Sequence, residues 1–200
     1  MTLIAKNKGG SDFKPAPAGT HVAICNLVAD MGVQPTAKYA PRHQVYVRWE
    51  LPNEIATWKD AAGKEQTGPM MIGQKYTMSL SEKANLRADL ESWRGRVFTE
   101  AELRGFDIKN ILGKPCMLGI AHNVTPQKTY ATISAVMGLT KGVTVPPPSV
   151  TPIAYDIDAH DPAVFAQLPA WLQEAINGRI RSDKATTVAA EGDFDDDIPF

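Results

Sequence analysis

The sequence has 200 residues, of which 44% are hydrophobic and 22% are charged. This length suits one ordinary domain with an appendage, and the apolar fraction is enough for a hydrophobic core. No apolar run approaches membrane-spanning length, and no basic flank precedes an apolar stretch near the N-terminus, so we expect a soluble, cytoplasmic protein.

Cys25 and Cys116 are the two cysteines, and each lies within an apolar run. We therefore expect buried, reduced thiols rather than a disulfide, and the sequence has no spacing of residues that would indicate a metal site. A phosphate-binding loop is also absent, so the sequence implies no cofactor.

The formal net charge of -1 hides an uneven distribution. Residues 191–200 contain five acids and no base, whereas residues 1–150 contain 18 Lys and Arg against 12 Asp and Glu. A mildly basic body with a separate acidic end is the layout expected of a nucleic-acid binder that also recruits proteins.

Residues 1–19 are predicted to form a loose arm, because prolines interrupt a polar stretch. A first strand is predicted over residues 21–29, and a second, with the clearest alternation, over residues 43–51. The buried face of the second strand is predicted to carry Val45, Val47, Trp49 and Leu51, and its outer face Tyr46, Arg48 and Glu50.

Residues 53–69 contain glycines and a proline and are predicted to form a long mobile loop, followed by a third strand over residues 74–80. A helix is predicted over residues 81–93, with Ser81 as its N-cap. Its apolar stripe consists of Leu86, Leu90 and Trp93.

Short capped turns are predicted over residues 99–102 and 107–112, followed by a hairpin of strands over residues 116–124 and 130–137. The resulting order, β-β-β-α-β-β over residues 20–140, describes a mainly β protein with appended helices. This order is typical of the OB-fold, a five-stranded Greek-key barrel that commonly binds single strands.

Residues 141–160 are predicted to form a stiff Pro-rich linker. Asp161 and Pro162 then begin a helix predicted over residues 161–180, with a kink at Pro169. Its apolar stripe favours packing on its own domain over packing on a second copy, although a homo-oligomer stays open. Residues 181–200 are predicted to be disordered.

The chain ends in an acidic run joined to an apolar tripeptide: Asp195, Asp196, Asp197, Ile198, Pro199 and Phe200. Such a segment cannot build a core. It is suited to partner binding, with Phe200 in an apolar pocket, the terminal carboxylate on a basic residue and the aspartates steering the approach. A tail that only aids solubility would explain the aspartates but not the apolar tripeptide.

The ending from Asp193 to Phe200 closely resembles the C-terminal tip of bacterial single-stranded DNA-binding proteins. The resemblance implies recruitment of host or phage replication and repair enzymes, such as helicases, exonuclease I or polymerase accessory subunits. The body instead resembles phage-encoded replication-associated proteins over residues 45–51, 79–93 and 110–116, which implies a phage protein of DNA replication, recombination or repair.

Single-strand binding needs cations that neutralise phosphates and flat side chains on which bases stack. The predicted DNA-binding residues are Tyr39, Arg42, Tyr46, Arg48, Trp58, Lys59, Lys75, Lys128 and Tyr130. Tyr46, Arg48 and Lys75 would share one face if the second and third strands pair. The alternative for Tyr46 is packing beneath the C-terminal helix.

The sequence therefore predicts a non-enzymatic, sequence-tolerant binder of single-stranded DNA, with RNA not distinguished by these contacts. One alternative is an adaptor or decoy that uses the tip without binding DNA. Another is a nuclease with His160, Asp156, Asp158 and Asp161 as metal ligands, but their spacing matches no known motif and Asp161 is explained by helix capping.

Overall fold

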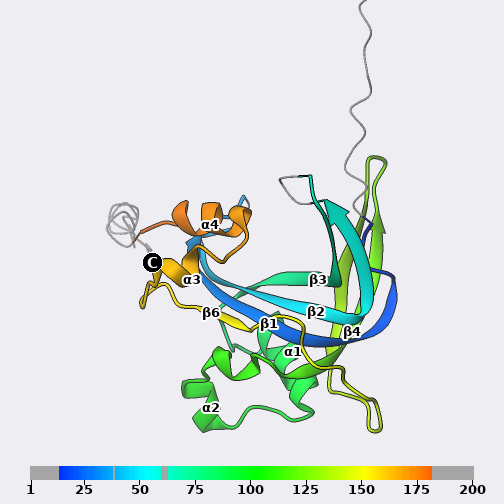
Figure 1. Ribbon diagram of the computed structural model, residues 1–200. Coiled ribbons are helices and arrows are strands. Elements are labelled where there is room, and N and C mark those ends of the chain that lie inside the picture. Colours follow the sequence, from blue (N-terminus) through cyan, green and yellow to red (C-terminus); the bar gives the residue numbers. More distant parts are fainter. Residues whose placement is uncertain (1–13, 38, 60–62, 182–200) are drawn as a thin grey trace, which may run out of the picture.

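The computed structural model of the protein describes residues 14–37, 39–59 and 63–181. The described chain is mainly β, with an antiparallel sheet and a few helices (Figure 1). Its strands are β1 (Gly19–Gln34), β2 (Arg42–Lys59), β3 (Glu65–Thr77), β4 (Pro115–Val124), β5 (Thr129–Met137) and β6 (Ile153–Tyr155). Its helices are α1 (Asn85–Arg94), α2 (Glu100–Arg104), the 3-10 helix η1 (Ile108–Ile111), α3 (Pro162–Phe165) and α4 (Ala170–Asn177). Among the described residues, no helix has the length and apolar character needed to cross a membrane.

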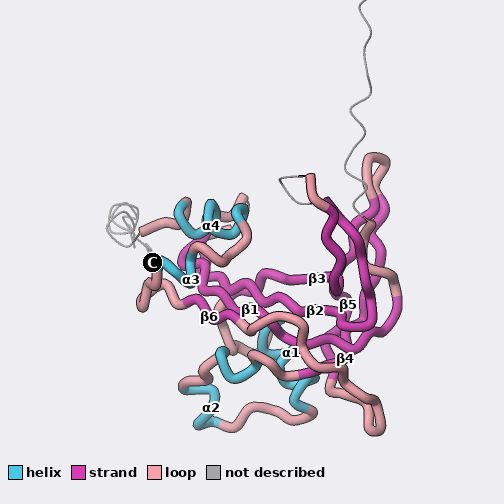
Figure 2. The backbone as a smooth tube through the Cα atoms, in the orientation of Figure 1, coloured by secondary structure: helices cyan, strands magenta, loops and turns pink. Residues whose placement is uncertain are grey.

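The sheet has the strand order β3-β2-β1-β4-β5, and β6 pairs with β1 beside this path. Neighbouring strands are antiparallel, except that β6 runs parallel to β1. The long strands bend strongly along their length (Figure 2). The predicted β-β-β-α-β-β order is confirmed for the first five strands, since α1 stands between β3 and β4 in the chain.

β1 is longer than the predicted first strand and organises the sheet. Its residues 19–24 pair with β4, its residues 24–34 pair with β2, and its residues 27–29 pair with β6. The register with β2 shifts between Cys25 and Leu27. An irregularity of this kind bends a strand and increases its twist. The bend lets the first half of β1 pair with β4 and the second half pair with β2.

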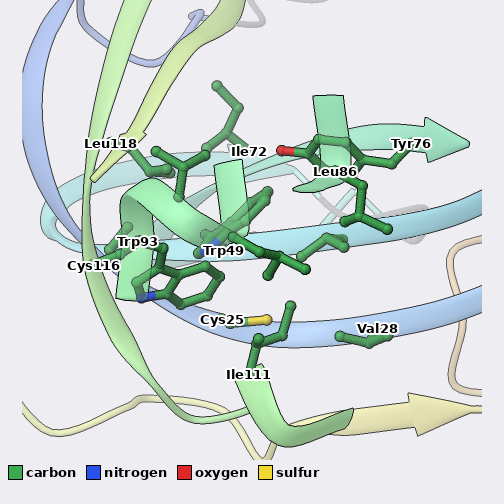
Figure 3. Packing of buried hydrophobic residues seen from close by; sticks show 14 of the residues in the cluster. Cys25, Val28, Trp49, Ile72, Tyr76, Leu86, Trp93, Ile111, Cys116 and Leu118 are labelled. Atoms are coloured by element: carbon green, nitrogen blue, oxygen red, sulfur yellow. The ribbon is translucent and has the colours of Figure 1, made fainter. Parts of the chain in front are cut away.

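The main hydrophobic core lies between one face of the sheet and α1 (Figure 3). The helix contributes its predicted stripe, and β2 contributes the four residues predicted for its buried face. The rings of Trp49 and Trp93 pack with centroids 6.0 Å apart. Trp93 Nε1 donates a hydrogen bond of 2.9 Å to the carbonyl oxygen of Pro115, so the indole is buried with its polar atom satisfied.

A second, smaller hydrophobic cluster lies on the opposite face of the sheet, beneath α4. β1 contributes Leu27, Ala29 and Met31. The C-terminal segment contributes Leu172 and Ile176 of α4 and Leu168, which lies between α3 and α4. Figure 1 shows α4 on the side of the sheet opposite to α1. The predicted packing of the C-terminal stripe on its own domain is therefore confirmed.

The C-terminal helix is divided in two rather than kinked. Asp161 caps α3 as predicted, because its carboxylate accepts from the backbone N–H of Ala163 and of Val164. Pro169 stands at the N-cap of α4. Proline has no N–H to donate to the preceding turn and its ring crowds that turn, so the helix stops and restarts there.

The prediction of a long mobile loop over residues 53–69 is wrong, because most of these residues form a hairpin. β2 and β3 pair from Ile55 opposite Pro69 to Lys59 opposite Glu65. The register shifts between Leu51 and Ile55, and this irregularity accommodates Pro52, which has no N–H for a regular ladder. These arms are held by their mutual hydrogen bonds rather than by burial.

Three smaller expectations are also corrected. Ser81 is not the N-cap of α1, which begins at Asn85 after Ala84. The predicted linker over residues 141–160 contains β6. Residues 153–155 pair with residues 27–29 of β1, beyond the part of β1 that pairs with β4. Residues 1–13 of the predicted arm lie outside the described residues, but Ala16 is buried in the main core.

Cys25 and Cys116 are free and buried, as predicted. Burial raises the pKa of the Cys25 thiol to about 12, and it also raises the pKa of the Cys116 thiol. Both side chains therefore stay protonated at neutral pH and act as small apolar groups of the main core (Figure 3).

Candidate nucleic-acid interface

The outer face of β2 has the register that the sequence predicts. Tyr46 lies directly opposite Lys75 of β3, and Arg48 lies opposite Gly73. Because side chains two residues apart share a face of a strand, Tyr46, Arg48 and Lys75 point to the same side of the sheet. The conditional prediction for these three residues is confirmed.

The C-terminal segment covers much of this outer face. Trp171 of α4 meets the Tyr46 ring edge to face, with centroids 4.9 Å apart and planes at 86°. Tyr46 is partly buried against the second hydrophobic cluster, and burial raises the pKa of its phenol. The alternative reading of Tyr46, packing beneath the C-terminal helix, is therefore the one that the structure confirms.

Gly73 provides the room in which Tyr46 lies. A Cβ atom on Gly73 would clash with the phenol oxygen and the ring carbon that carries it. The glycine is needed here for close approach, since the Tyr46 side chain crosses β3 at this position.

Arg48 is also engaged within the protein. Its Nε donates a hydrogen bond of 3.0 Å to Oδ1 of the fully buried Asn26. Partial burial lowers the pKa of the Arg48 guanidinium. Only Nε of Arg48 has a hydrogen-bond partner among the described residues. The side chain is nevertheless less available to a phosphate than its outward position on β2 indicates, because it is partly buried and held by Asn26.

Glu50, the third outer-face residue of β2, holds the segment that leads to β6. Its carboxylate is fully buried and accepts from the backbone N–H of Ser149 at 2.9 Å and from the Ser149 hydroxyl at 3.1 Å. A buried carboxyl group that accepts two hydrogen bonds is a strong attachment point, because breaking them would leave buried polar atoms without partners. This contact attaches the chain at Ser149 to the sheet.

Exposed aromatic rings with a cation nearby occur at three places in the described chain. The charged groups of Arg42, Lys75 and Lys128 lie 5.4, 5.2 and 5.4 Å from the ring centroids of Tyr39, Trp171 and Tyr130, respectively. The exposed fractions of these rings are 67% for Tyr39, 42% for Trp171 and 47% for Tyr130. Each place presents a flat apolar surface and a positive charge to solvent together.

Trp171 is the residue of this set that the sequence prediction missed. A signal for it exists, because Leu168, Leu172 and Ile176 define the buried stripe and Trp171 lies beside that stripe rather than on it. A large aromatic residue off the apolar stripe of an amphipathic helix is exposed on at least part of its ring.

Trp58 and Lys59 lie near the end of the β2–β3 hairpin. The Trp58 side chain approaches Gly68 of β3, and 48% of it remains exposed. The β2–β3 and β4–β5 hairpins both project to the side of the sheet that carries α4 (Figure 1). The structure thus brings together Tyr46, Lys75 and Trp171, whereas Trp58, Lys59, Lys128 and Tyr130 belong to separate hairpin ends.

Three of the four residues considered for a metal-dependent nuclease have other partners. Tyr155 OH and His160 Nδ1 are hydrogen-bonded at 2.8 Å, Asp156 forms an ion pair with Lys109, and Asp161 caps α3. Within the described ranges, no group of three or more His, Cys, Asp or Glu residues is arranged to hold a metal ion. The predicted partner-binding residues Asp195–Phe200 lie outside the described residues.

A scan against models of protein families found no match to the chain, and a search of curated proteins found no similar sequence.

Proposed function

We propose that the protein is a sequence-tolerant single-stranded DNA-binding protein, phage-encoded, that acts in DNA replication, recombination or repair. The observation that carries the proposal is the recurrence of an exposed aromatic ring with a cation beside it, at Tyr39, Trp171 and Tyr130. Stacking of a base on an aromatic ring contributes about 1–3 kcal/mol and is tolerant of sequence, because every base has a flat face. The neighbouring cation neutralises the adjoining phosphate.

The strand order supports this proposal, because it matches that of a fold that commonly binds oligonucleotides. The order β3-β2-β1-β4-β5, with α1 between β3 and β4 in the chain, is compatible with an OB-fold barrel in which β3 and β5 approach each other. OB-folds commonly bind oligonucleotides across the second and third strands and the loops beside them. Tyr46, Arg48, Lys75 and the β2–β3 hairpin belong to this region.

The acidic ending gives the protein its second proposed role. Asp195–Phe200 would capture host or phage enzymes of replication and repair, by their resemblance to the tip of bacterial single-stranded DNA-binding proteins. The DNA-binding body and the partner-binding tip would then bring such enzymes to exposed single strands.

One structural observation favours the alternative role of adaptor or decoy. The C-terminal segment covers Tyr46 and binds Glu50, so part of the outer face expected to bind DNA is occupied by the protein itself. An adaptor would use the tip for protein binding and would leave DNA unbound.

Fluorescence anisotropy with labelled oligo-dT tests the proposal. The full chain should bind, the affinity should fall with rising salt, and Tyr39→Ala, Tyr130→Ala and Trp171→Ala should each weaken binding. Arg104→Gln on α2 is the control, since α2 lies on the other side of the sheet from α4 (Figure 1). Absence of binding by the full chain would overturn the proposal, and magnesium-dependent cleavage of the oligonucleotide would indicate a nuclease instead.

The proposed tip is tested by removing residues 191–200 and measuring capture of purified exonuclease I. The truncated protein should keep or increase its affinity for oligo-dT and lose the enzyme. Capture by a full chain that binds no oligo-dT would support the adaptor.

A further inference from the structure

A hollow with a volume of about 400 Å³ lies beside the end of β3 and the start of α1. Three basic residues line it, Arg42, Lys75 and Lys83, together with the hydroxyl residues Thr77, Ser79 and Ser81. No Asp or Glu is among its lining residues. Its size is within the range of small-molecule sites, but its lining is far more polar and positive than is usual for an apolar ligand.

The three basic side chains have no acidic partner among the residues that the structure describes. Within residues 14–37, 39–59 and 63–181, none of them forms an ion pair, whereas Arg87, Arg94, Arg96 and Lys109 all do. Like charges that share a concave surface repel one another and raise the local positive potential. A bound anion would remove that repulsion.

The start of α1 adds to the positive character of the hollow. Ala84 stands at the N-cap and lines the hollow, and it has no side-chain oxygen to cap the first turn. The N–H groups of that turn are therefore left to solvent or to a ligand, and the helix dipole favours a negative charge there. In this hollow the helix terminus supplements the three cations.

Lys75 connects the hollow to an exposed aromatic ring. It lines the hollow, and its Nζ lies 5.2 Å from the centroid of the Trp171 ring. Lys75 thus contributes to the lining of the hollow and carries its charge beside the Trp171 ring. In a single strand, each phosphate lies close to the base of the adjoining nucleotide, so Lys75 could contact both.

We propose that the hollow binds a backbone phosphate of a single strand and that Trp171 stacks the adjoining base, a proposal that rests on the function proposed above. Arg42, Lys75 and Lys83 neutralise the phosphate, and the Ser81 hydroxyl, which accepts a hydrogen bond from Ser79 Oγ, donates its own proton to a phosphate oxygen. The site gives a role to the exposed Trp171 ring and to the lysine beside it.

The test is a salt series of oligo-dT binding followed by anisotropy. Each phosphate contact contributes about 0.7 to the slope of log affinity against log salt for single strands. The triple variant R42Q/K75Q/K83Q should lower the slope by up to about 2, and K83Q alone by about 0.7. Trp171→Ala should weaken binding about 5- to 100-fold and leave the slope unchanged, because stacking carries no counterion release.

The matched control is R104Q/K114Q/K141Q, which removes the same charge from three exposed residues outside the hollow. Circular dichroism confirms that each variant is folded, and K83Q serves if the triple variant is not. Wild-type binding with slopes equal in the triple variant and the control would overturn this site but leave the proposed function intact. Failure of the wild-type protein to bind oligo-dT would overturn both.

Discussion

Tyr46 on β2 and Trp171 on α4 meet edge to face, with ring centroids 4.9 Å apart. An edge-to-face pair adds about 0.5–1.5 kcal/mol to the area that the two rings bury. The contact joins the sheet to the C-terminal helices, so a residue expected to bind DNA also holds the fold together. Loss of DNA affinity in a Tyr46 variant would therefore report on helix docking as well as on direct contact.

Tyr46→Ala should lower the free energy of unfolding by about 2–3 kcal/mol, because it removes a partly buried ring and the packing of α4 on it. Urea denaturation followed by circular dichroism measures the loss. Tyr130→Ala is the control, since 47% of that side chain is exposed in the β4–β5 hairpin. Equal stability of the two variants would show that the Tyr46–Trp171 contact contributes nothing.

Gly73→Ala should displace the Tyr46 ring and lower the free energy of unfolding by about 1–3 kcal/mol, because the added methyl group would occupy the same space as the phenol. Trp171 fluorescence should change with it, as the ring loses its partner. The control is Gly105→Ala, where a Cβ atom meets nothing within 4 Å. An unchanged spectrum and stability for Gly73→Ala would contradict the close approach.

Ser149→Ala should lower the free energy of unfolding by about 1–2 kcal/mol, because the buried Glu50 carboxylate loses one of its two hydrogen bonds. Ser149→Pro removes the backbone donor as well and should cost more. Urea denaturation and limited proteolysis of residues 141–152 compare the variants. The exposed Thr151→Ala is the control, and stability equal to it would show that Glu50 does not need Ser149.

Glu102 should make the protein sensitive to acid. The hydrogen bonds from Arg96 and from the backbone N–H of Thr99 lower the pKa of the Glu102 carboxyl from 4.5 to about 2. The folded state therefore binds fewer protons than the unfolded state between these values, so this contribution is present above about pH 4.5 and is lost as the pH falls toward 2.

Thermal melts between pH 2 and pH 6 measure this effect. Glu102→Gln should be less stable than the wild-type protein at pH 6, and the difference should shrink toward pH 2. Glu100→Gln changes an exposed residue on the same helix and leaves Glu102 in place. Its thermal stability should depend on pH as that of the wild-type protein does. A difference between Glu102→Gln and wild type that stays constant over the range would contradict the prediction.

Elements with a buried face were predictable from the sequence. The alternation in β2 and the α1 stripe both reflect one face in contact with the core, and burial selects residue type at each position. The capping box of Thr99 and Glu102 and the cap on α3 were also readable, since each needs only local hydrogen bonds.

The β2–β3 hairpin was not predictable in the same way. Half-buried and exposed positions alternate along much of the arms, but the apolar residues Ile55 and Trp58 are exposed, so the alternation is not visible in the residue types. Their strand form depends on the partner strand, which a single stretch of sequence does not reveal. Pro52 and Pro69 also point away from a strand, and they are tolerated because one lies at a register shift and the other where pairing resumes beyond it.

The sequence predicted which residues of the candidate site share a face of the sheet, but not that the C-terminal segment covers part of that face. Alternation placed Tyr46, Arg48 and Lys75 on one face correctly. The docking of Trp171 on Tyr46, and of Ser149 on Glu50, joins residues far apart in the chain. Such contacts depend on how the C-terminal segment crosses the sheet, and no local pattern encodes that path.

The short strand β6 makes residues 141–181 an integral part of the fold rather than a detachable extension. β4 pairs with β1 only as far as Ile24, and β6 takes up the same edge at residues 27–29. Without β6 and α4, that stretch would present unsatisfied backbone donors and acceptors beside the bared side chains of Leu27 and Met31. A protein trimmed to its first five strands would be prone to self-association through that edge.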